Sequence, residues 1–369
     1  MTETFTARSR YALEAKELAA VLGAQKVLDV PSLQVNSNEV FVIIGPNGSG
    51  KTTLLLCLAL LLKPTAGRVL YDGRDVQTSS ALRLRRETAA VFQDPFLLNR
   101  TVRDNVNLGL RLRGVKRSDI SIRADRWLER FGVAHLANRQ ARTLSGGEAK
   151  RVSLARAFAL QPRILFLDEP FNALDTPTRQ GLLEDFERVL RETRMTTVMV
   201  THDHNEALAL ADSLAVLING RLHQIGKPEE VFSSPVDEEV AGFVEAGNIL
   251  QGTVSAQNNG VASVTICGRE VQAVSGLGQG TKVAVYLHYE DVTLTLNVPA
   301  TALSSARNQL RGTITRVFPL GPQLKVTLDC GCTLSSLITR HSWDDLGLEV
   351  GKEVVASFKA SSVRLIPKL

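Results

Sequence analysis

A glycine-rich segment that ends in Lys51 could hold the phosphates of a nucleotide. It follows Phe41 to Ile44, four apolar residues that predict a buried strand. Because glycine has no side chain, the loop can turn its backbone N–H groups toward an anion at the start of the next helix. Lys51 would reach the β- and γ-phosphates, and the Thr52 hydroxyl would bind Mg²⁺. The predicted nucleotide-binding residues of this loop are Gly45, Pro46, Asn47, Gly48, Ser49, Gly50, Lys51, Thr52 and Thr53.

Acidic residues and a histidine follow two other apolar runs. Ile164 to Leu167 precedes Asp168 and Glu169, and Thr196 to Thr201 precedes His202. Parallel strands deliver such residues to the carboxyl edge of a sheet, where a phosphate loop also opens. We expect Asp168 to hold Mg²⁺ through its water shell and Glu169 to orient or deprotonate the attacking water. A single histidine at a strand end is usually structural, but here it could contact the γ-phosphate or the water.

Three small residues, Ser145 to Gly147, precede a helix that we expect over Ala149 to Leu160. Their N–H groups and the positive end of the helix dipole would form a second anion site. Such a turn often serves only as a helix cap, and its occurrence together with a phosphate loop favours the anion site. Asp203 and Glu206 have the spacing of an N-terminal cap and its acidic partner.

The composition limits the possible partners and compartments. A length of 369 residues is enough for two domains, and a net charge of +5 from dispersed Lys and Arg predicts no nucleic-acid partner. The four cysteines are too scattered for a disulfide framework, and Cys330-Gly-Cys332 is better explained as a turn between strands than as a metal site. The first residues lack the apolar core of a secretion signal, and the longest apolar run, Leu54 to Leu62, is too short to cross a bilayer.

Local patterns predict the surrounding elements. Leu54 to Leu62 should continue the helix that starts near Lys51, and Lys63-Pro64 and Gly67 should end it. Val102 to Arg142 is rich in helix formers and arginine, which predicts a helical subdomain inserted in an α/β core. Further strands are expected at 11–18, 27–35, 68–71 and 89–92.

Residues from about 11 to 235 resemble the ATP-binding subunit of an ABC transporter. Six motifs stand in the order of that family: the phosphate loop, Gln93 as the Q-loop, Leu144 to Glu148 as the signature, the strand that ends in Asp168 and Glu169, Asp175 in the D-loop, and His202 as the switch histidine. The resemblance implies a P-loop NTPase fold of the α/β class and hydrolysis of ATP with Mg²⁺.

The same resemblance implies a head-to-tail homodimer. Ser145, Gly146, Gly147 and Glu148 of one copy would complete the nucleotide site of the other. Gln93 would join Thr52 and Asp168 at the metal and link it to a membrane permease, and Asp175 would lie at the dimer contact. The apolar stretch Phe96-Leu97-Leu98 would touch the permease, which places the chain on the cytoplasmic face of the cell membrane. Leu22 stands where the family usually carries an aromatic residue that stacks on adenine.

Beyond Pro235 the chain becomes rich in Val, Thr and Gly and contains an internal repeat. Asn248 to Val254 parallels Asn308 to Ile314, and Val283 to Val292 parallels Val354 to Val363. Two copies of a short all-β unit predict a pair of small barrels or one fused sandwich, and we expect an OB-like barrel domain built from two repeats. The predicted bounds are 1–235 for the ATP-binding domain with its helical subdomain at about 102–142, 236–247 for a linker, and 248–369 for the β-rich domain with repeats at about 248–300 and 304–369.

The second repeat resembles the molybdate- and tungstate-binding barrel appended to the ATPases of oxyanion importers. A tetrahedral dianion requires N–H groups, hydroxyls and a cation. The candidate oxyanion site consists of Ser305, Ala306, Arg307, Asn308, Lys359 and Ser361. The alternative is that this barrel only dimerises and stiffens the chain.

The predicted function is that of the energy-coupling ATPase of an importer for tungstate or molybdate. An importer of another ion, such as sulfate or iron, is the first alternative. The second is an ABC-type ATPase without a permease that acts on nucleic acid or translation. Proteins of that second class usually carry two ATPase cassettes, whereas this chain has one phosphate loop and one Leu-Ser-Gly-Gly-Glu signature.

Overall fold

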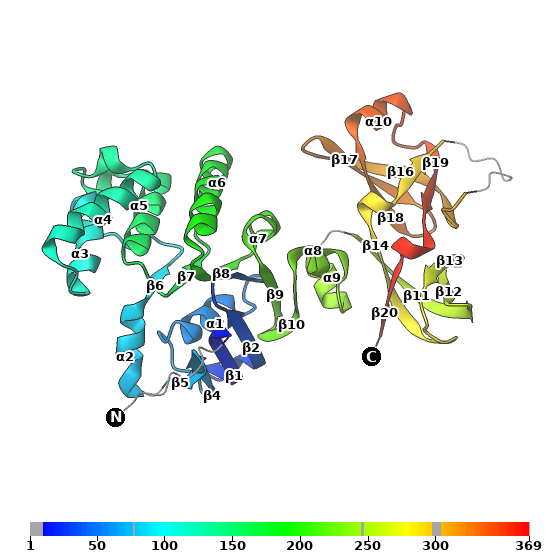
Figure 1. Cartoon of the computed structure of the whole chain (residues 1–369). Coiled ribbons are helices and arrows are strands. Elements are labelled where there is room, and N and C mark those ends of the chain that lie inside the picture. Colours follow the sequence, from blue (N-terminus) through cyan, green and yellow to red (C-terminus); the bar gives the residue numbers. More distant parts are fainter. Residues whose placement is uncertain (1–9, 77, 245–246, 297–303, 369) are drawn as a thin grey trace. The chain divides into compact units, whose positions relative to one another are not determined.

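The computed structural model describes residues 10–76, 78–244, 247–296 and 304–368, and the chain divides into two compact units between Glu229 and Glu230 (Figure 1). The division falls inside helix α8 (Pro228–Ser233), a few residues before the predicted end of the ATP-binding domain at 235. The predicted repeat boundaries near 300 lie outside the described residues. None of the helices in the described part of the chain combines the length and apolar character needed to cross a bilayer.

The first unit contains two sheets. A four-stranded antiparallel sheet has the order β2-β1-β4-β5, and a six-stranded sheet has the order β10-β9-β3-β8-β7-β6, in which only the β9–β10 pair is antiparallel. The predicted α/β class is therefore confirmed. The strands are β1 (Tyr11–Leu22), β2 (Gln25–Asn36), β3 (Val40–Ile44), β4 (Ala66–Tyr71), β5 (Arg74–Asp75), β6 (Thr88–Val91), β7 (Ile164–Asp168), β8 (Thr196–Thr201), β9 (Ser213–Ile218) and β10 (Arg221–Gly226).

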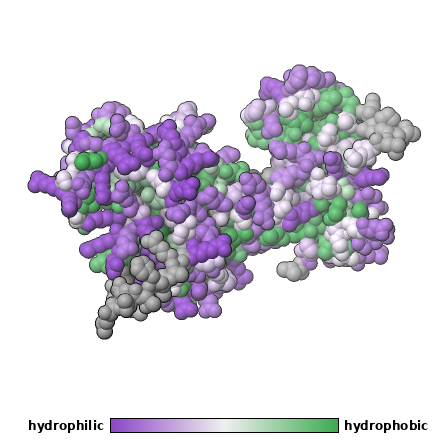
Figure 2. All heavy atoms as spheres, viewed as in Figure 1, coloured by the Kyte–Doolittle hydropathy of each residue, from purple (hydrophilic) through white to green (hydrophobic). Residues whose placement is uncertain are grey.

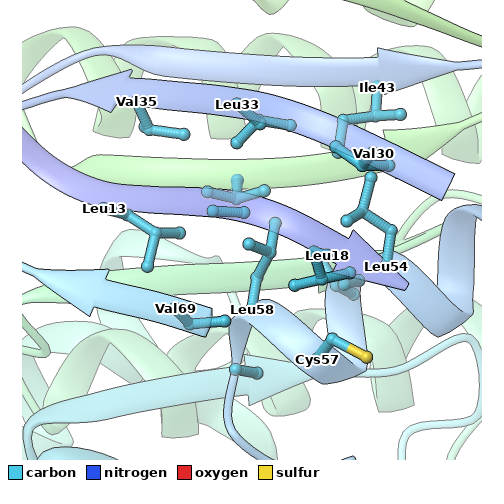
Figure 3. Packing of buried hydrophobic residues seen from close by; sticks show 14 of the residues in the cluster. Leu13, Leu18, Val30, Leu33, Val35, Ile43, Leu54, Cys57, Leu58 and Val69 are labelled. Atoms are coloured by element: carbon cyan, nitrogen blue, oxygen red, sulfur yellow. The ribbon is translucent and has the colours of Figure 1, made fainter. Parts of the chain in front are cut away.

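Helix α1 (Lys51–Leu58) packs against strands of both sheets, and its buried residues Leu54, Cys57 and Leu58 join those of β1 and β2 in one core (Figure 3). The expectation that this helix continues to Leu62 was wrong. It ends at Leu58 because Leu60 takes a left-handed φ of 60°, and the N–H groups of Leu60 and Leu61 donate back to the carbonyls of Cys57 and Leu56. This is a Schellman motif without its usual glycine.

Along the sequence, the helices of the first unit alternate with the strands of the parallel sheet. Residues 102–142 form α3, α4 and two short 3-10 turns, as the helical pattern predicted, and α5 follows. Trp127 and Phe131, one turn apart, pack on Phe158 of α5 with ring centroids 5.0 and 5.5 Å away. The remaining bounds are α2 (Thr78–Glu87), α3 (Val102–Leu112), α4 (Arg117–Arg130), α5 (Gly146–Ala159), α6 (Thr176–Thr193) and α7 (His204–Leu210).

The second unit consists of two five-stranded antiparallel sheets and short helices. The sheet orders are β13-β12-β11-β14-β20 and β15-β19-β16-β17-β18. The bounds are α9 (Glu238–Val244), β11 (Gly247–Asn258), β12 (Val261–Ile266), β13 (Arg269–Val274), β14 (Lys282–His288), η3 (Tyr289–Asp291), β15 (Thr293–Thr295), β16 (Asn308–Leu320), β17 (Gln323–Asp329), β18 (Thr333–Thr339), α10 (Arg340–Asp345), β19 (Glu353–Phe358), η4 (Ala360–Ser362) and β20 (Arg364–Pro367).

The two repeats exchange their last strands. Strand β20 of the second repeat pairs with β14, and β15 of the first repeat pairs with β19, so each sheet contains strands of both repeats. Part of the expected linker, 236–247, is helix α9, whose Val240, Ala241 and Val244 are buried and whose start is capped by Asp237. The turn predicted at Cys330-Gly-Cys332 is confirmed, with Gly331 at a φ of 85°.

A buried asparagine in each repeat holds a strand of the other repeat. Asn248 donates to the Ser335 carbonyl of β18 (2.9 Å) and accepts from the Ser335 N–H (2.6 Å). Asn308 makes the same pair of bonds with the backbone of Gln272 on β13, at 2.9 and 2.7 Å. Each amide therefore takes the place of a strand residue, and the two repeats form a single structural unit.

We expect Asn248→Ala to loosen the second unit selectively. Removing the amide leaves the buried N–H and carbonyl of Ser335 without their side-chain partner, at a cost of about 1–3 kcal/mol. Hydrogen exchange measured by mass spectrometry should therefore become about tenfold or more faster in β11 and β18. Gln257→Ala, an exposed position on the same strand, is the control. Equal protection in both variants would contradict the role of Asn248.

Candidate nucleotide-binding site

The phosphate loop wraps the start of α1 as its glycines require. Gly50 is the N-cap of α1 with a φ of 100°, and Gly48 has a φ of 81°. A Cβ at Gly45 would lie 2.0 Å from the carbonyl oxygen of Leu217 on β9, so only glycine fits there. The loop is thus held against the end of the parallel sheet.

Two features of this loop suit a bound phosphate. Lys51 is buried, and its Nζ donates to the carbonyls of Gly45 (2.8 Å) and Pro46 (2.9 Å), which keeps the ammonium inside the loop. The Ser49 hydroxyl is buried and has no hydrogen-bond partner. An unpartnered buried hydroxyl beside a lysine is costly unless a ligand oxygen satisfies it.

Helix α1 and strand β7 bring together the predicted metal-binding residues Thr52 and Asp168. The Thr52 hydroxyl donates to Asp168 Oδ1 at 2.9 Å. Burial raises the pKa of Asp168, and the Thr52 hydrogen bond opposes that shift. Burial lowers the pKa of Lys51, which Glu169 and Asp168 partly counter. A carboxylate and a hydroxyl that lie side by side are hard oxygen ligands of the kind that Mg²⁺ binds, so Thr52 and Asp168 fit this ion.

The third predicted metal residue, Gln93, lies two residues after the end of β6 and is exposed. Its backbone carbonyl accepts a hydrogen bond from Lys150, whose pKa is lowered by burial. Within the described residues, no hydrogen bond links the Gln93 side chain to Thr52 or Asp168.

Glu169 and His202 meet at the ends of neighbouring strands. His202 Nδ1 lies 3.0 Å from Glu169 Oε1, and the Asn172 amide donates to Glu169 Oε2 at 2.8 Å. Glu169 also has a φ of 45°, a strained conformation for a residue with a side chain. Both carboxylate oxygens are therefore held in place, which is what orienting a water molecule requires.

An arginine on α6 fixes the segment that carries His202. Arg179 contacts Glu206 Oε1 at 2.5 Å and Asp203 Oδ2 at 2.6 Å. Glu206 is 2% exposed and also accepts from the Thr201 hydroxyl at 2.5 Å. The predicted cap is confirmed, since Asp203 accepts from the N–H groups of Asn205 and Glu206. Glu206 binds Arg179 and Thr201 rather than completing a capping box.

The signature residues start α5 as a capping box. The Ser145 side chain accepts from the Glu148 N–H, and Glu148 accepts from the Ser145 N–H at 2.7 Å. That backbone hydrogen bond lowers the pKa of Glu148. A Cβ at Gly146 would meet open space, whereas one at Gly147 would lie 2.6 Å from Thr178 Cγ2 on α6. The exposed N–H end of α5 stays available to an anion.

Asp175 in the D-loop caps α6. Its carboxylate accepts from the Thr178 N–H (3.2 Å) and hydroxyl (3.0 Å), and the hydroxyl is the main cause of its lowered pKa. Signature, D-loop and switch segments therefore all contact α6.

Two apolar segments of the first unit are exposed. Phe96 is 66% exposed with a φ of 42°, and its carbonyl accepts from Arg156 of α5. Leu98 of the same stretch is exposed as well. Leu22 lies at the tip of the β1–β2 hairpin and is 48% exposed, so no aromatic ring stands at that tip.

The candidate oxyanion residues lie in the second unit, at one end of the β16–β19 pair. Asn308 pairs with Phe358 in the ladder, which puts Arg307 and Lys359 at the same strand ends. Ser305, Arg307, Lys359 and Ser361 are exposed, and Ala306 is half-buried. The Asn308 amide is occupied by Gln272, so the structure leaves the serines and cations as the available ligands.

Comparison with known proteins follows the same division. The sequence pattern of the family described as ABC transporter matches residues 28–172, and that of the family described as TOBE domain matches residues 304–365. A molybdate/tungstate import ATP-binding protein (WtpC) of Pyrococcus abyssi is 38% identical over 345 residues, which covers 92% of this chain and 96% of that protein.

The chain belongs to the ATP-binding subunits of ABC transporters. It is the ATP-binding subunit of an ABC importer with a TOBE domain, and its reaction is ATP hydrolysis that drives import.

Other relatives are named for other substrates. A sulfate/thiosulfate import ATP-binding protein (CysA) of Caulobacter vibrioides is 38% identical over 303 residues. The matched region covers 81% of this subunit and 86% of that protein. A spermidine/putrescine import ATP-binding protein (PotA) of Mesorhizobium japonicum is 33% identical, with 87% and 88% covered. A solved dimeric structure of the ATP-binding cassette MJ0796, bound to ADP and Pi, matches with a TM-score of 0.54 at 29% identity over 58% of this chain and 98% of that one.

Sequence patterns missed Asn172 and Arg179. Asn172 lies only three residues after its partner Glu169, whereas the partners of Arg179 are Asp203, the cap of α7, and Glu206 within α7. Only the placement of α6 beside α7 brings Arg179 to them. An arginine four residues after a helix cap carries no signal of that contact by itself.

We expect Arg179→Ala to destabilise the first unit by about 2–4 kcal/mol, because it leaves the buried Glu206 carboxylate without its cation. Urea unfolding followed by Trp127 fluorescence in a Trp343→Phe background would measure this. Adding Glu206→Gln should recover part of the loss, since the uncompensated charge is then removed. Arg188→Ala on the same helix, whose side chain is 62% exposed, is the control. Equal loss in Arg179→Ala and Arg188→Ala would exclude the charge explanation.

Proposed function

We propose that this subunit forms a homodimer that closes head to tail on two ATP and Mg²⁺ and drives a permease for molybdate or tungstate at the cytoplasmic face of the membrane. The carrying observation is the convergence of Lys51, Thr52, Asp168, Glu169 and His202 at one edge of the parallel sheet. The nearly full-length similarity to a molybdate/tungstate import protein supports the substrate. The proposed domains are 1–235 and 248–369, on either side of the segment that contains α9.

In this proposal the phosphate loop, Gly45 to Thr53, and Lys51 bind the β- and γ-phosphates. Thr52 and Asp168 hold Mg²⁺, which neutralises phosphate charge when bound, and Gln93 approaches the metal as the dimer closes. Glu169 accepts a proton from the attacking water or orients it. His202, held by Glu169 and by the Arg179-anchored segment, binds the γ-phosphate.

The second copy completes each site. Ser145 to Gly147 would present the N–H end of α5 to the γ-phosphate, and the capping box already fixes that end without using all its N–H groups. Asp175 would lie at the contact. The dimeric state of the similar cassette MJ0796 supports this arrangement.

Phe96 supports a permease contact beside Gln93. An aromatic side chain 66% exposed on a loop is an apolar surface that a partner would cover. Arg156 holds the Phe96 and Pro95 carbonyls, so movement of α5 would reach this loop directly. Nucleotide-driven closure and permease movement would thereby be coupled.

The second unit is proposed to be an oxyanion-sensing domain. Its two sheets share one buried core, which supports an OB-like barrel. Ser305, Arg307, Lys359 and Ser361 combine two cations with two hydroxyls at adjoining strand ends, a set that suits a tetrahedral dianion. Sulfate is the second candidate, because a sulfate/thiosulfate import protein is equally identical over less of the chain.

Glu169→Gln should keep ATP binding and trap the closed dimer, while ATP hydrolysis falls by about 100-fold or more. The amide keeps the size of the side chain but cannot accept the proton. Phosphate release and ATP-dependent dimerisation, followed by light scattering, would measure both effects. Glu184→Gln at an exposed position of α6 is the control. Turnover at the normal rate in Glu169→Gln would remove that residue from the catalytic role.

Titration calorimetry of the full chain should show tight binding of tungstate and molybdate and weaker binding of sulfate. Arg307→Ala with Lys359→Ala should weaken the tight binding about tenfold or more, since two charged contacts are lost. Arg311→Ala, an exposed cation on the same strand, should not. Absence of oxyanion binding in the unaltered chain would leave the second unit with a dimerising role only.

A further inference from the structure

A pocket of about 530 Å³ lies in the second unit, on one face of the β16–β17 hairpin. It is lined among others by Asn248, Tyr289, Arg316, Phe318, Lys325 and Thr327. None of these belongs to the candidate oxyanion site at Arg307 and Lys359. We call it the hairpin pocket.

The two cations of the hairpin pocket lie close together on one face. Arg316 pairs with Thr327 across the ladder and Phe318 pairs with Lys325, so Arg316 and Lys325 are diagonal neighbours. Among the described residues, neither has a carboxylate within ion-pair distance. Two like charges at the wall of one concavity repel each other and attract an anion.

Tyr289 on η3 fixes one of these cations. Lys325 Nζ donates to the Tyr289 hydroxyl at 2.9 Å and lies 4.0 Å from the centre of its ring. This contact leaves two ammonium protons for another acceptor. The Thr327 hydroxyl lies 3.4 Å from that of Ser335 on the pocket wall. Donors from three elements thus converge on the same space.

The internal repeat shows that the fold does not require these cations. Val254 and Ala256 pair with Val264 and Ser263 in the first repeat as Ile314 and Arg316 pair with Leu328 and Thr327 in the second. The same register aligns Val261 with Lys325. The first repeat therefore builds an equivalent hairpin with Ala256 and Val261, which carry no charge.

We propose that the hairpin pocket binds a small organic anion whose phosphate or carboxylate group lies between Arg316 and Lys325. Its volume is within the range of about 300–1,000 Å³ that small organic ligands occupy. Phe318 is 52% exposed at the pocket and offers an apolar wall to the rest of the ligand. Figure 2 shows apolar residues exposed over this unit, whereas hydrophilic residues cover most of the visible face of the helical region around α3 to α6.

Calorimetry on the full chain with phenyl phosphate as the probe tests this. All proteins would carry Lys51→Ala together with Arg307→Ala and Lys359→Ala, so that phosphate binding at the phosphate loop and at the candidate oxyanion site is weakened equally. Phenyl phosphate should bind with one-to-one stoichiometry, and adding Arg316→Ala and Lys325→Val should weaken it about tenfold or more. These substitutions install the residues of the first repeat, so the melting temperature should not change. Arg311→Ala, an exposed cation of β16 outside both sites, should leave phenyl phosphate binding unchanged.

Inorganic phosphate is the second probe and should bind at least about tenfold more weakly, because it cannot contact Phe318. Equal affinity of phenyl phosphate for the Arg316→Ala, Lys325→Val protein and its parent would overturn the proposal. Equal affinity of the protein for the two probes would contradict the proposal that the ligand is organic. If the double variant has a lowered melting temperature, the single variant Arg316→Gln replaces it in the test. Unchanged phenyl phosphate binding by a stably folded Arg316→Gln protein would also overturn the proposal.

Discussion

The balance of charge at the carboxyl edge of the central sheet is the constraint on which the first unit depends. Lys51 is desolvated inside the phosphate loop, and Asp168 is desolvated at the end of β7. The Lys51 ammonium is stabilised by the nearby Glu169 and Asp168 carboxylates. The Asp168 carboxylate is stabilised by the Thr52 hydroxyl and by Lys51, whereas the like charge of Glu169 opposes its ionisation. A nucleotide and its metal would add opposite charges to a site that is already poised to receive both.

The architecture around this edge serves to hold those charges still. Helix α1 packs against both sheets, so the loop before it cannot shift without disturbing the core (Figure 3). Helix α6 then connects the parts that would act between two copies: Thr178 packs on Gly147, Asp175 caps its start, and Arg179 binds the segment of His202. A displacement at the D-loop or the signature would thereby reach the switch histidine through one rigid helix.

The second unit follows a different principle, exchange between two repeats. Strands β15 and β20 cross over, and Asn248 and Asn308 each pair with backbone of the opposite repeat. Neither repeat can therefore bury its core alone. Because the same hairpin is built twice, the differences between the copies mark residues that the fold leaves free, and the cations of the second copy are such residues.

The sequence by itself determined the strands that end at the sheet edge, the phosphate loop, the helix cap at Asp203 and the residue types at that edge. These follow from local patterns: apolar runs, glycines and capping spacings act within a few residues of each other. Only the tertiary structure decided where α1 ends, because the left-handed Leu60 is imposed by packing and not by a glycine. It also decided the strand exchange, the Arg179 contacts and the hairpin pocket, since each joins residues that are distant along the chain and carry no shared local signal.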